Sequence, residues 1–270
     1  MNFLKDVRRT IKSYIATKPP LQGDWQDQLT VPSIAEFSGD CVTVRNVRNF
    51  RYNPTEDDLH PGYYDKTYDL THIKRVWFMV EPFNSHKMVA HTLVSFEFSS
   101  GDCLAISMEA RKTKSQGFSA WNGLFRTYPL IYVAADERDV ILLRANVRKD
   151  NVYLYSIKLN DPSDTKPLLI DILTTMNELV STHPRWYHSL FANCTSSIAK
   201  HINKITSRRI PLWSWQLWLT ASADALALKH GFLDTTMPLR QAREKFRINI
   251  MSEFAGDVPG YSTVIRNFKE

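Results

Sequence analysis

The period of hydrophobic and polar positions changes near Asp161-Pro162. From Val31 to about Leu159, short β-branched and aromatic runs alternate with turn signals such as Ser38-Gly39-Asp40, the pattern of successive β-strands. One helical turn is expected near Leu70. The expected strands cover residues 41–46, 73–81, 88–98, 103–110, 128–134, 138–145 and 152–158.

Beyond this boundary the apolar positions recur every three or four residues, as in amphipathic helices. The first helical face consists of Leu168, Ile172, Leu173, Met176, Leu179 and Val180. A second helix is expected after Asn193 and a third over about 221–230, ended by Gly231. Strands first and helices later predict an α+β fold, with one domain over residues 25–270.

A basic amphipathic segment, residues 1–24, precedes this domain. Its apolar residues follow helical spacing, and it carries a single acid, Asp6. The accompanying basic residues are Lys5, Arg8, Arg9, Lys12 and Lys18. Such a helix suits an acidic lipid surface, and the alternative is a helix packed on its own domain. Pro19-Pro20 ends the predicted helix.

Composition narrows the function classes. Hydrophobic residues make up 43% and charged residues 23% of the 270, as in an ordinary globular protein. No apolar run approaches the roughly 20 residues of a transmembrane helix, and the charged first residues do not resemble a secretory signal. The net charge of +6 is dispersed among acids, and no nucleic-acid-binding motif occurs. We therefore expect no nucleic-acid partner and consider an anionic membrane surface the better match.

The segment MVAHTLVSFEFSSGDCLAISMEAR predicts a β-hairpin. Its turn, Ser99-Ser100-Gly101, fits a three-residue loop that ends in a left-handed glycine and fixes the register of the strands. In this register the even positions are almost wholly apolar and form the expected buried face. The odd positions place His91 directly opposite Glu109, so the carboxylate can accept a proton from the ring. The alternative is a surface pair of little energetic weight.

A candidate nucleophile opens one of the predicted helices. Cys194, Ile198, Ile202 and Ile205 follow helical spacing, and Asn193 is a favoured N-cap residue. Cys194 therefore takes the first helical position, where unpaired N–H groups and the helix dipole stabilise a thiolate. The same N–H groups can hold the oxyanion of a tetrahedral intermediate.

The other cysteines and several histidines could be structural residues or metal ligands. Three cysteines cannot all pair with one another, so at least one thiol is free. Cys41 and Cys103 each follow Gly-Asp at the start of a strand and resemble small hydrophobic residues. The sequence leaves open whether they face one another. A cluster of potential zinc ligands, with spacings that match no common motif, consists of His183, His188, Cys194 and His201. We expect no metal and no cofactor.

From about Trp25 to Leu233, the chain resembles the Lnb N-terminal periplasmic domain family. The motifs that carry the resemblance are Val44–Phe50, Thr67–Leu70, His91–Phe96, Ile106–Arg111, Gly123–Tyr132, Asp136–Val140 and Asn193–Thr195. The family is similar to permuted NlpC-type papain-like enzymes, in which the histidine and its polar partner precede the cysteine. The resemblance thus implies an antiparallel sheet packed against the nucleophile helix.

The resemblance also implies a substrate class and a location. Lnb-type proteins are associated with N-acylation of bacterial lipoproteins, which implies acyl-lipid donors or lipidated protein acceptors. The implied location is the periplasm or the outer face of the inner membrane. Trp213, Trp215 and Trp218 suit contact with a lipid surface, although such tryptophans are also common in cores.

Together these features predict a Cys-His-Glu enzyme that forms a thioester, with Cys194 as nucleophile, His91 as base and Glu109 as its partner. Asn193, the Cys194 N–H and Tyr187 are the candidate oxyanion donors. Five arginines are candidates for a substrate phosphate or carboxylate, or else form structural ion pairs: Arg48, Arg111, Arg126, Arg138 and Arg144. Two alternatives stay open, a cysteine peptidase or amidase acting on cell-wall peptides and a non-catalytic binding module with the same fold.

Overall fold

The computed structural model describes residues 17–52, 59–84, 86–117, 119 and 121–268. At its centre is a mixed eight-stranded sheet in the order β1-β2-β9-β8-β7-β6-β10, with β5 paired to β2. Its strands are β1 (Ile34–Ser38), β2 (Cys41–Arg48), β5 (Tyr63–Asp69), β6 (Ile73–Phe83), β7 (His86–Phe98), β8 (Cys103–Ala110), β9 (Leu130–Ala135) and β10 (Tyr153–Ser156). A separate pair joins β3 (Arg51–Tyr52) to β4 (Leu59–His60).

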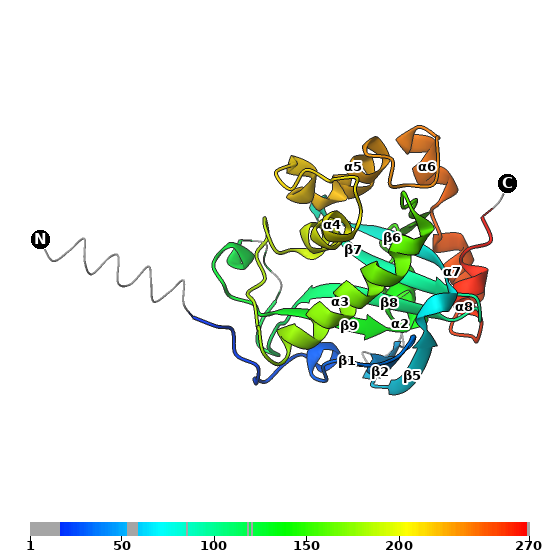
Figure 1. Cartoon of the computed structure of the whole chain (residues 1–270). Helices are drawn as coiled ribbons and strands as arrows, with labels where there is room; N and C mark the ends of the chain where they lie inside the picture. Colours follow the sequence, from blue (N-terminus) through cyan, green and yellow to red (C-terminus); the bar gives the residue numbers. More distant parts are fainter. Residues whose placement is uncertain (1–16, 53–58, 85, 118, 120, 269–270) are drawn as a thin grey trace, which may run out of the picture.

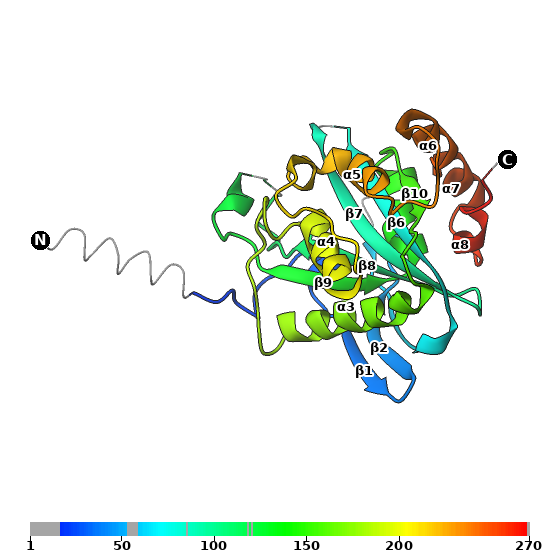
Figure 2. The same cartoon turned by 45° about the horizontal axis from the view of Figure 1, so that its top comes forward.

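Helices cover both faces of this sheet, so the predicted α+β class is confirmed. The α-helices of the described residues are α2 (Glu137–Leu142), α3 (Thr165–Leu179), α4 (Cys194–Ile205), α5 (Ala223–Lys229), α6 (Leu239–Lys245), α7 (Asn249–Ala255) and α8 (Tyr261–Val264). Figures 1 and 2 show α3 and α4 side by side against one face of the sheet. Helices α2, α7 and α8 pack on the opposite face.

The sheet departs from the expected antiparallel arrangement at one place. Strands β2 and β9 pair in parallel, with Arg48 opposite Ala135, whereas the other neighbouring strands of the sheet are antiparallel. A parallel pair requires a crossover connection, here the long path from β2 through the two hairpin strands. The expectation of a purely antiparallel sheet is therefore wrong at this junction.

The hairpin of β7 and β8 has the predicted register. Leu93 pairs with Ser107 and Glu97 with Cys103. The turn glycine, Gly101, has the left-handed φ of 88° that the loop requires. The ladder ends at the first of these pairs, so the expected pairing of His91 with Glu109 falls beyond its last hydrogen-bonded rung.

Both faces of this hairpin are buried, which corrects the expectation of one buried face. Even positions such as Phe96 and Ile106 pack in the core that contains α3 and α4. Odd positions such as Leu93 and Ala105 pack in a second core, together with Val140 of α2 and residues of α7 and α8. The second core was missed because its helix α2 was predicted as a strand.

The predicted strand over residues 138–145 is a helix. The apolar run there is short and fits either structure by pattern alone. Asp136 decides between them, because its side chain accepts a hydrogen bond from the N–H of Arg138 and caps α2. The helix continues as a π-helical segment, Leu143–Val147, a geometry frequent at functional sites. This segment carries Arg144 to the end of the central hairpin.

The other predicted helices are confirmed close to their expected bounds. The turn near Leu70 is a 3-10 helix, and Gly231 follows α5 with a φ of 70°. The predicted basic helix lies almost wholly outside the described residues, which begin at Thr17. No helix in the described ranges combines the length and apolar character needed to cross a lipid bilayer.

Candidate active site

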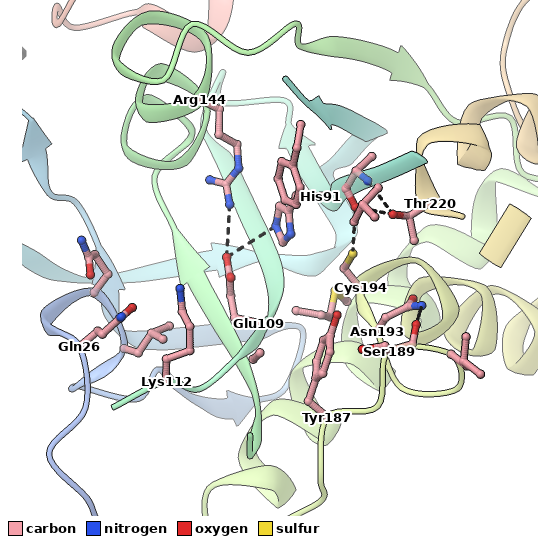
Figure 3. A pocket seen from close by; sticks show the side chains of 18 of the residues that line it. Gln26, His91, Glu109, Lys112, Arg144, Tyr187, Ser189, Asn193, Cys194 and Thr220 are labelled. Atoms are coloured by element: carbon pink, nitrogen blue, oxygen red, sulfur yellow. Dashed lines mark hydrogen bonds and ion pairs between the residues drawn. The ribbon is translucent and has the colours of Figure 1, made fainter. Parts of the chain in front are cut away.

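A cavity of about 640 Å³ lies at the end of the β7–β8 ladder, where the two strands separate. Its walls come from these strands, the start of α4, the π-helical segment and several loops. The three predicted catalytic residues, His91, Glu109 and Cys194, all line it. In the view of Figure 3, the ring of His91 lies between the carboxylate of Glu109 and the sulfur of Cys194.

Cys194 is the first residue of α4, as the sequence predicts. The Asn193 side chain accepts a hydrogen bond from the N–H of Ser196 at 2.7 Å, and the Ser196 hydroxyl accepts one from the N–H of Asn193 at 3.0 Å. This reciprocal capping fixes the start of the helix. The apolar side chains Ile198 and Ile202 bury the following turns against the sheet. The nucleophile candidate therefore sits on a rigid support.

The sulfur of Cys194 lies in a buried pocket of the wall. It contacts the carbonyl oxygen of Ala90 and the hydroxyl of Thr195, each at 3.9 Å. Burial raises the pKa of this thiol above its ordinary value. The ring of His91 is not among the described hydrogen-bond partners of the sulfur. The group is therefore a neutral thiol held by a backbone carbonyl.

Thr220 holds the strand that carries the histidine. Its hydroxyl accepts from the N–H of Ala90 and donates to the carbonyl of Ala90, both at 2.7 Å. Ala90 lies beyond the last rung of the β7–β8 ladder, where β8 no longer pairs with β7. Thr220 thereby fixes the backbone of Ala90, which contacts the candidate nucleophile Cys194 and directly precedes the candidate base His91.

His91 reaches the carboxylate through a residue that the sequence analysis missed, Ser107. The Nε2 atom of His91 lies 2.7 Å from the Ser107 hydroxyl, which donates to Oε1 of Glu109 at 2.7 Å. The direct separation of Nε2 and Oε1 is 3.6 Å. Ser107 occupies the same strand face two residues before Glu109, and this spacing was the available signal.

This chain of hydrogen bonds fixes the tautomer of the ring. A serine hydroxyl carries one hydrogen, and the ionised carboxylate of Glu109 can only accept. Since the Ser107 hydroxyl donates to Glu109, it must accept from His91, which places the ring proton on Nε2. The Nδ1 atom then keeps its lone pair and can act as a base.

Charges around the pair keep the imidazole neutral and the carboxylate ionised. Burial lowers the pKa of His91 to about 3, against the attraction of Glu109 and with the repulsion of Arg144. For Glu109, burial alone would raise the pKa. The charge of Arg144 and the Ser107 hydrogen bond nevertheless hold the pKa of Glu109 well below its usual range.

Arg144 joins this pair to a second buried acid, Glu81. Its guanidinium lies 2.6 Å from Glu81 and 3.3 Å from Glu109, and it also donates to the carbonyl of Val140. Burial raises the pKa of Glu81 to about 7, opposed by the charges of Arg144 and Arg148. Arg144 is thus committed to two carboxylates of the protein itself.

The candidate oxyanion donors differ in how far they are free to act. Both hydrogens of the Asn193 amide are used, by the carbonyls of Ser189 at 2.7 Å and Leu217 at 2.8 Å. The N–H of Cys194 has no partner within the helix, because the first turn of a helix leaves its N–H groups unpaired. Tyr187 lines the cavity, and in Figure 3 its hydroxyl points toward Cys194.

Two of the five candidate arginines line the cavity, Arg48 and Arg144. Arg48 forms a buried bidentate pair with Asp139 at 2.9 and 3.0 Å, one of the structural pairs that the sequence allows. The cavity wall does not include Arg111, Arg126 or Arg138.

The three arginines outside the cavity have other surroundings. Arg111 donates to backbone carbonyls, including that of Leu29, and stacks over the ring of Trp25. Arg138 pairs with Asp257 at 2.8 Å, and Arg126 lies in a loop with a left-handed φ of 52°. These three side chains therefore lie outside the cavity wall that carries the candidate reaction centre.

Exposed aromatic residues border the cavity. Trp121 and Trp218 line the cavity and are also 69% and 36% exposed. Trp121 packs edge-on against Phe125, and Trp218 against Phe191, with ring centroids 5.5 and 6.5 Å apart. We call these four residues the aromatic rim. Two further tryptophans of the same segment, Trp213 and Trp215, are also largely exposed.

Apart from Cys194 itself, the competing thiols and the candidate zinc ligands do not line the cavity. Cys41 and Cys103 are free and begin β2 and β8, as predicted. His201 binds Asp171 through Nδ1 at 2.7 Å and Tyr132 through Nε2 at 2.9 Å. No group of three or more His, Cys, Asp or Glu side chains suited to a metal ion occurs among the described residues.

Comparison with known proteins identifies a family for the chain. The family model described as the Lnb N-terminal periplasmic domain matches residues 60–221, a span that contains the hairpin, the capped helix start and the cavity residues between them. No curated protein and no solved structure matches the chain.

Proposed function

The chain belongs to the Lnb N-terminal periplasmic domain family, and from that premise we propose that it is a thiol-dependent acyl-transfer enzyme acting on lipid or lipoprotein substrates. The family is one of periplasmic domains, in agreement with the expected location. The proposal includes a permuted papain-like scaffold of the NlpC type, with Cys194 as nucleophile and His91 and Glu109 as its partners.

One observation carries the proposal: a cysteine at the first position of a capped helix and an oriented histidine–carboxylate pair line the same cavity. The histidine is neutral, and the proton on Nε2 leaves Nδ1 as a base. The helix start supplies an unpaired N–H beside the sulfur. Nucleophile, base and oxyanion donor are the groups that acyl transfer through a thioester requires.

In the proposed first step, the sulfur leaves the carbonyl of Ala90 and approaches Nδ1 of His91. The ring takes the thiol proton while the sulfur attacks the acyl carbonyl of the substrate. The carbonyl electrons pass to its oxygen, which accepts hydrogen bonds from the N–H of Cys194 and the hydroxyl of Tyr187. Glu109, through Ser107, stabilises the imidazolium that forms.

The tetrahedral intermediate then collapses to a thioester as the leaving oxygen or nitrogen takes the proton from His91. An amine or water attacks the thioester in the second half-reaction, and His91 again removes the proton of the attacking group. The Cys194 sulfur is regained with that proton. The aromatic rim supports a lipid substrate, because exposed tryptophans beside a cavity suit the interface between acyl chains and water.

One observation favours the alternative of a non-catalytic binding module. The thiol of Cys194 has a raised pKa and hydrogen-bonds to a backbone carbonyl, so it is not a thiolate paired with an imidazolium. Under our proposal this is the substrate-free form of a general-base mechanism. Under the alternative it is simply a buried cysteine, and the two differ in reactivity.

A thiol-directed probe such as iodoacetamide separates these cases. We expect labelling of Cys194 in the wild type and no label at that position in Cys194→Ala. Loss of the base in His91→Ala should slow labelling by about a hundredfold, the usual contribution of a positioned general base. Peptide mass spectrometry after digestion identifies the modified residue.

The other two thiols serve as internal controls. Cys103 is largely buried, and burial raises the pKa of its thiol well above the ordinary value, so it should remain unlabelled in all three proteins. Preferential labelling of Cys41 or Cys103, or a rate at Cys194 that His91→Ala leaves unchanged, would argue against the enzymatic proposal. If the probe labels Cys194 in the wild type but water is the sole acyl acceptor, the result would support a hydrolase, that is a peptidase or amidase, over the transferase.

A further inference from the structure

The cavity contains a lysine that the catalytic proposal does not use. Lys112 lines the wall just beyond the end of β8, and no hydrogen bond or ion pair of its ammonium group is found in the described part of the chain. Its backbone is held in place, because its carbonyl accepts a hydrogen bond from the N–H of Gln26 at 2.9 Å. An unpaired cation in a partly enclosed cavity is costly and is stabilised by an anionic ligand.

The three arginines of the cavity differ in how fully they are already paired with acidic side chains of the protein. Arg48 is neutralised by Asp139, and Arg144 lies between Glu81 and Glu109. Arg148, in contrast, lies 3.8 Å from Glu81 at its closest, and its side chain is 48% exposed. Lys112 and Arg148 are therefore the cavity cations that keep capacity for a ligand.

Lys112 lies within electrostatic range of both Glu109 and Arg148. Burial lowers the pKa of Lys112, Glu109 raises it, and the charge of Arg148 lowers it again. Figure 3 shows Lys112 and Gln26 on the opposite side of Glu109 from Cys194. An anion beside Lys112 would thus lie across the reaction centre from the nucleophile.

Apolar groups lie on the side of the nucleophile. Asn193, next to Cys194, binds the carbonyls of Ser189 and Leu217, so the neighbouring residues Leu190 and Trp218 are held beside the helix start. Both of these side chains line the cavity, as does Leu219. One cavity therefore offers an apolar wall near the sulfur and unpaired positive charge beyond the acid.

From this arrangement we propose that Lys112, with Arg148, binds the phosphate group of a phospholipid acyl donor whose acyl chain lies along Leu190, Trp218 and Leu219. The inference rests on the proposed function, because it names the donor for the same cysteine. It assigns substrate recognition to Lys112 and Arg148 in place of the arginines that the sequence suggests. A planar guanidinium and a mobile ammonium together suit a tetrahedral phosphate with several acceptor oxygens.

The test measures binding without turnover, in the Cys194→Ala protein. Three probes are titrated separately and followed by calorimetry: dihexanoylphosphatidylglycerol below its micelle concentration, dihexanoylglycerol, which has the same chains without the phosphate, and inorganic phosphate. We expect the phospholipid to bind at least about tenfold more tightly than dihexanoylglycerol, as a charge-assisted hydrogen bond allows.

Substitutions locate the phosphate. Lys112→Gln should remove most of the preference for the phospholipid, and Arg148→Gln should weaken it independently, while the affinity for dihexanoylglycerol stays the same. Lys114→Gln is the matched control, since Lys114 has the same charge two residues away but lies outside the cavity wall and pairs with Asp27. It should leave all affinities unchanged.

Two results would overturn the inference. One is equal binding of both lipids by the protein with Lys112 intact; the other is binding of inorganic phosphate that depends on Lys112 but gains nothing from acyl chains, which would indicate a free anion as ligand. Failure here is distinguishable from failure of the proposed function. A reactive Cys194 with equal lipid affinities removes only the phosphate subsite, and an inert Cys194 with Lys112-dependent lipid binding removes only the enzyme.

Discussion

At the scale of single residues, the central feature is the serine between the histidine and the carboxylate. A direct contact between His91 and Glu109 would leave the tautomer to one hydrogen bond of 3.6 Å, which is too long to count as one. Ser107 replaces it with two bonds of 2.7 Å. The basic atom of the ring is thereby turned away from the acid and remains available for the thiol.

This arrangement predicts the protonation state of His91. Because its pKa is lowered to about 3, the ring should stay neutral, with the proton on Nε2, from pH 8 down to pH 5. The unfolded chain takes up a proton near pH 6.5 whereas the folded protein does not. The free energy of unfolding should therefore fall as the pH drops below about 6.5. Nitrogen NMR shifts of the ring measure both charge and tautomer.

Replacing the serine tests its positioning role. Ser107→Ala should mix the two tautomers and lower the rate of acylation of Cys194 by about tenfold or more, as expected when a general base loses its orientation. The matched control is Ser95→Ala, a buried serine of the neighbouring strand that takes no part in the hydrogen bonds joining His91, Ser107 and Glu109. A ring that titrates near pH 6.5, or equal effects of the two substitutions, would contradict this account.

At the scale of elements, the features that depend on neighbouring residues in the sequence, such as turns and helix starts, were predicted correctly. The hairpin register followed from its glycine turn, and the start of α4 followed from Asn193 and the spacing of Ile198 and Ile202. The strands β1 and β5 were not predicted, because edge strands carry few apolar residues: Ile34–Ser38 is mostly exposed. Their place depends on pairing with β2, which no local pattern encodes.

Helix α2 illustrates what tertiary contacts add. Three of its charged residues, Glu137, Arg138 and Asp139, are buried, which a strand-like apolar run does not suggest. Each finds a partner far away in the chain, such as Asp139 with Arg48 of β2. Long-range ion pairs of this kind cannot be read from a single sequence, so the layer behind the sheet was missed.

The pair of Arg48 and Asp139 gives a prediction at this scale. Asp139→Asn should lower the free energy of unfolding by about 3 kcal/mol or more, because a buried guanidinium loses its counter-charge. The comparison is Glu36→Gln, which removes an exposed partner of Arg45 and should change stability far less. Urea denaturation followed by circular dichroism measures both. Equal losses would mean that the buried pair does not stabilise the contact of α2 with the sheet.

At the scale of the whole molecule, the sheet lies between an apolar layer and a layer rich in buried charges, and both layers contribute residues to the cavity. The layer with α3 and α4 presents the sulfur and an apolar wall, and the opposite layer presents Arg144, Glu81 and their neighbours. The two meet in the cavity where β7 and β8 part, at His91 and Glu109. The sequence predicted the catalytic candidates because they lie on locally readable elements. It gave no signal for Lys112, whose role depends on which other charges are already paired.

The central claim is that Cys194 accepts an acyl group from a substrate with the help of His91. Intact-protein mass spectrometry after incubation with phenyl hexanoate, an ester of low intrinsic reactivity, tests it most directly. We predict a gain of one hexanoyl group, located on Cys194 by digestion, removed by neutral hydroxylamine as a thioester, absent in Cys194→Ala and greatly slowed in His91→Ala. An unmodified Cys194, or equal acylation with and without His91, would contradict the account.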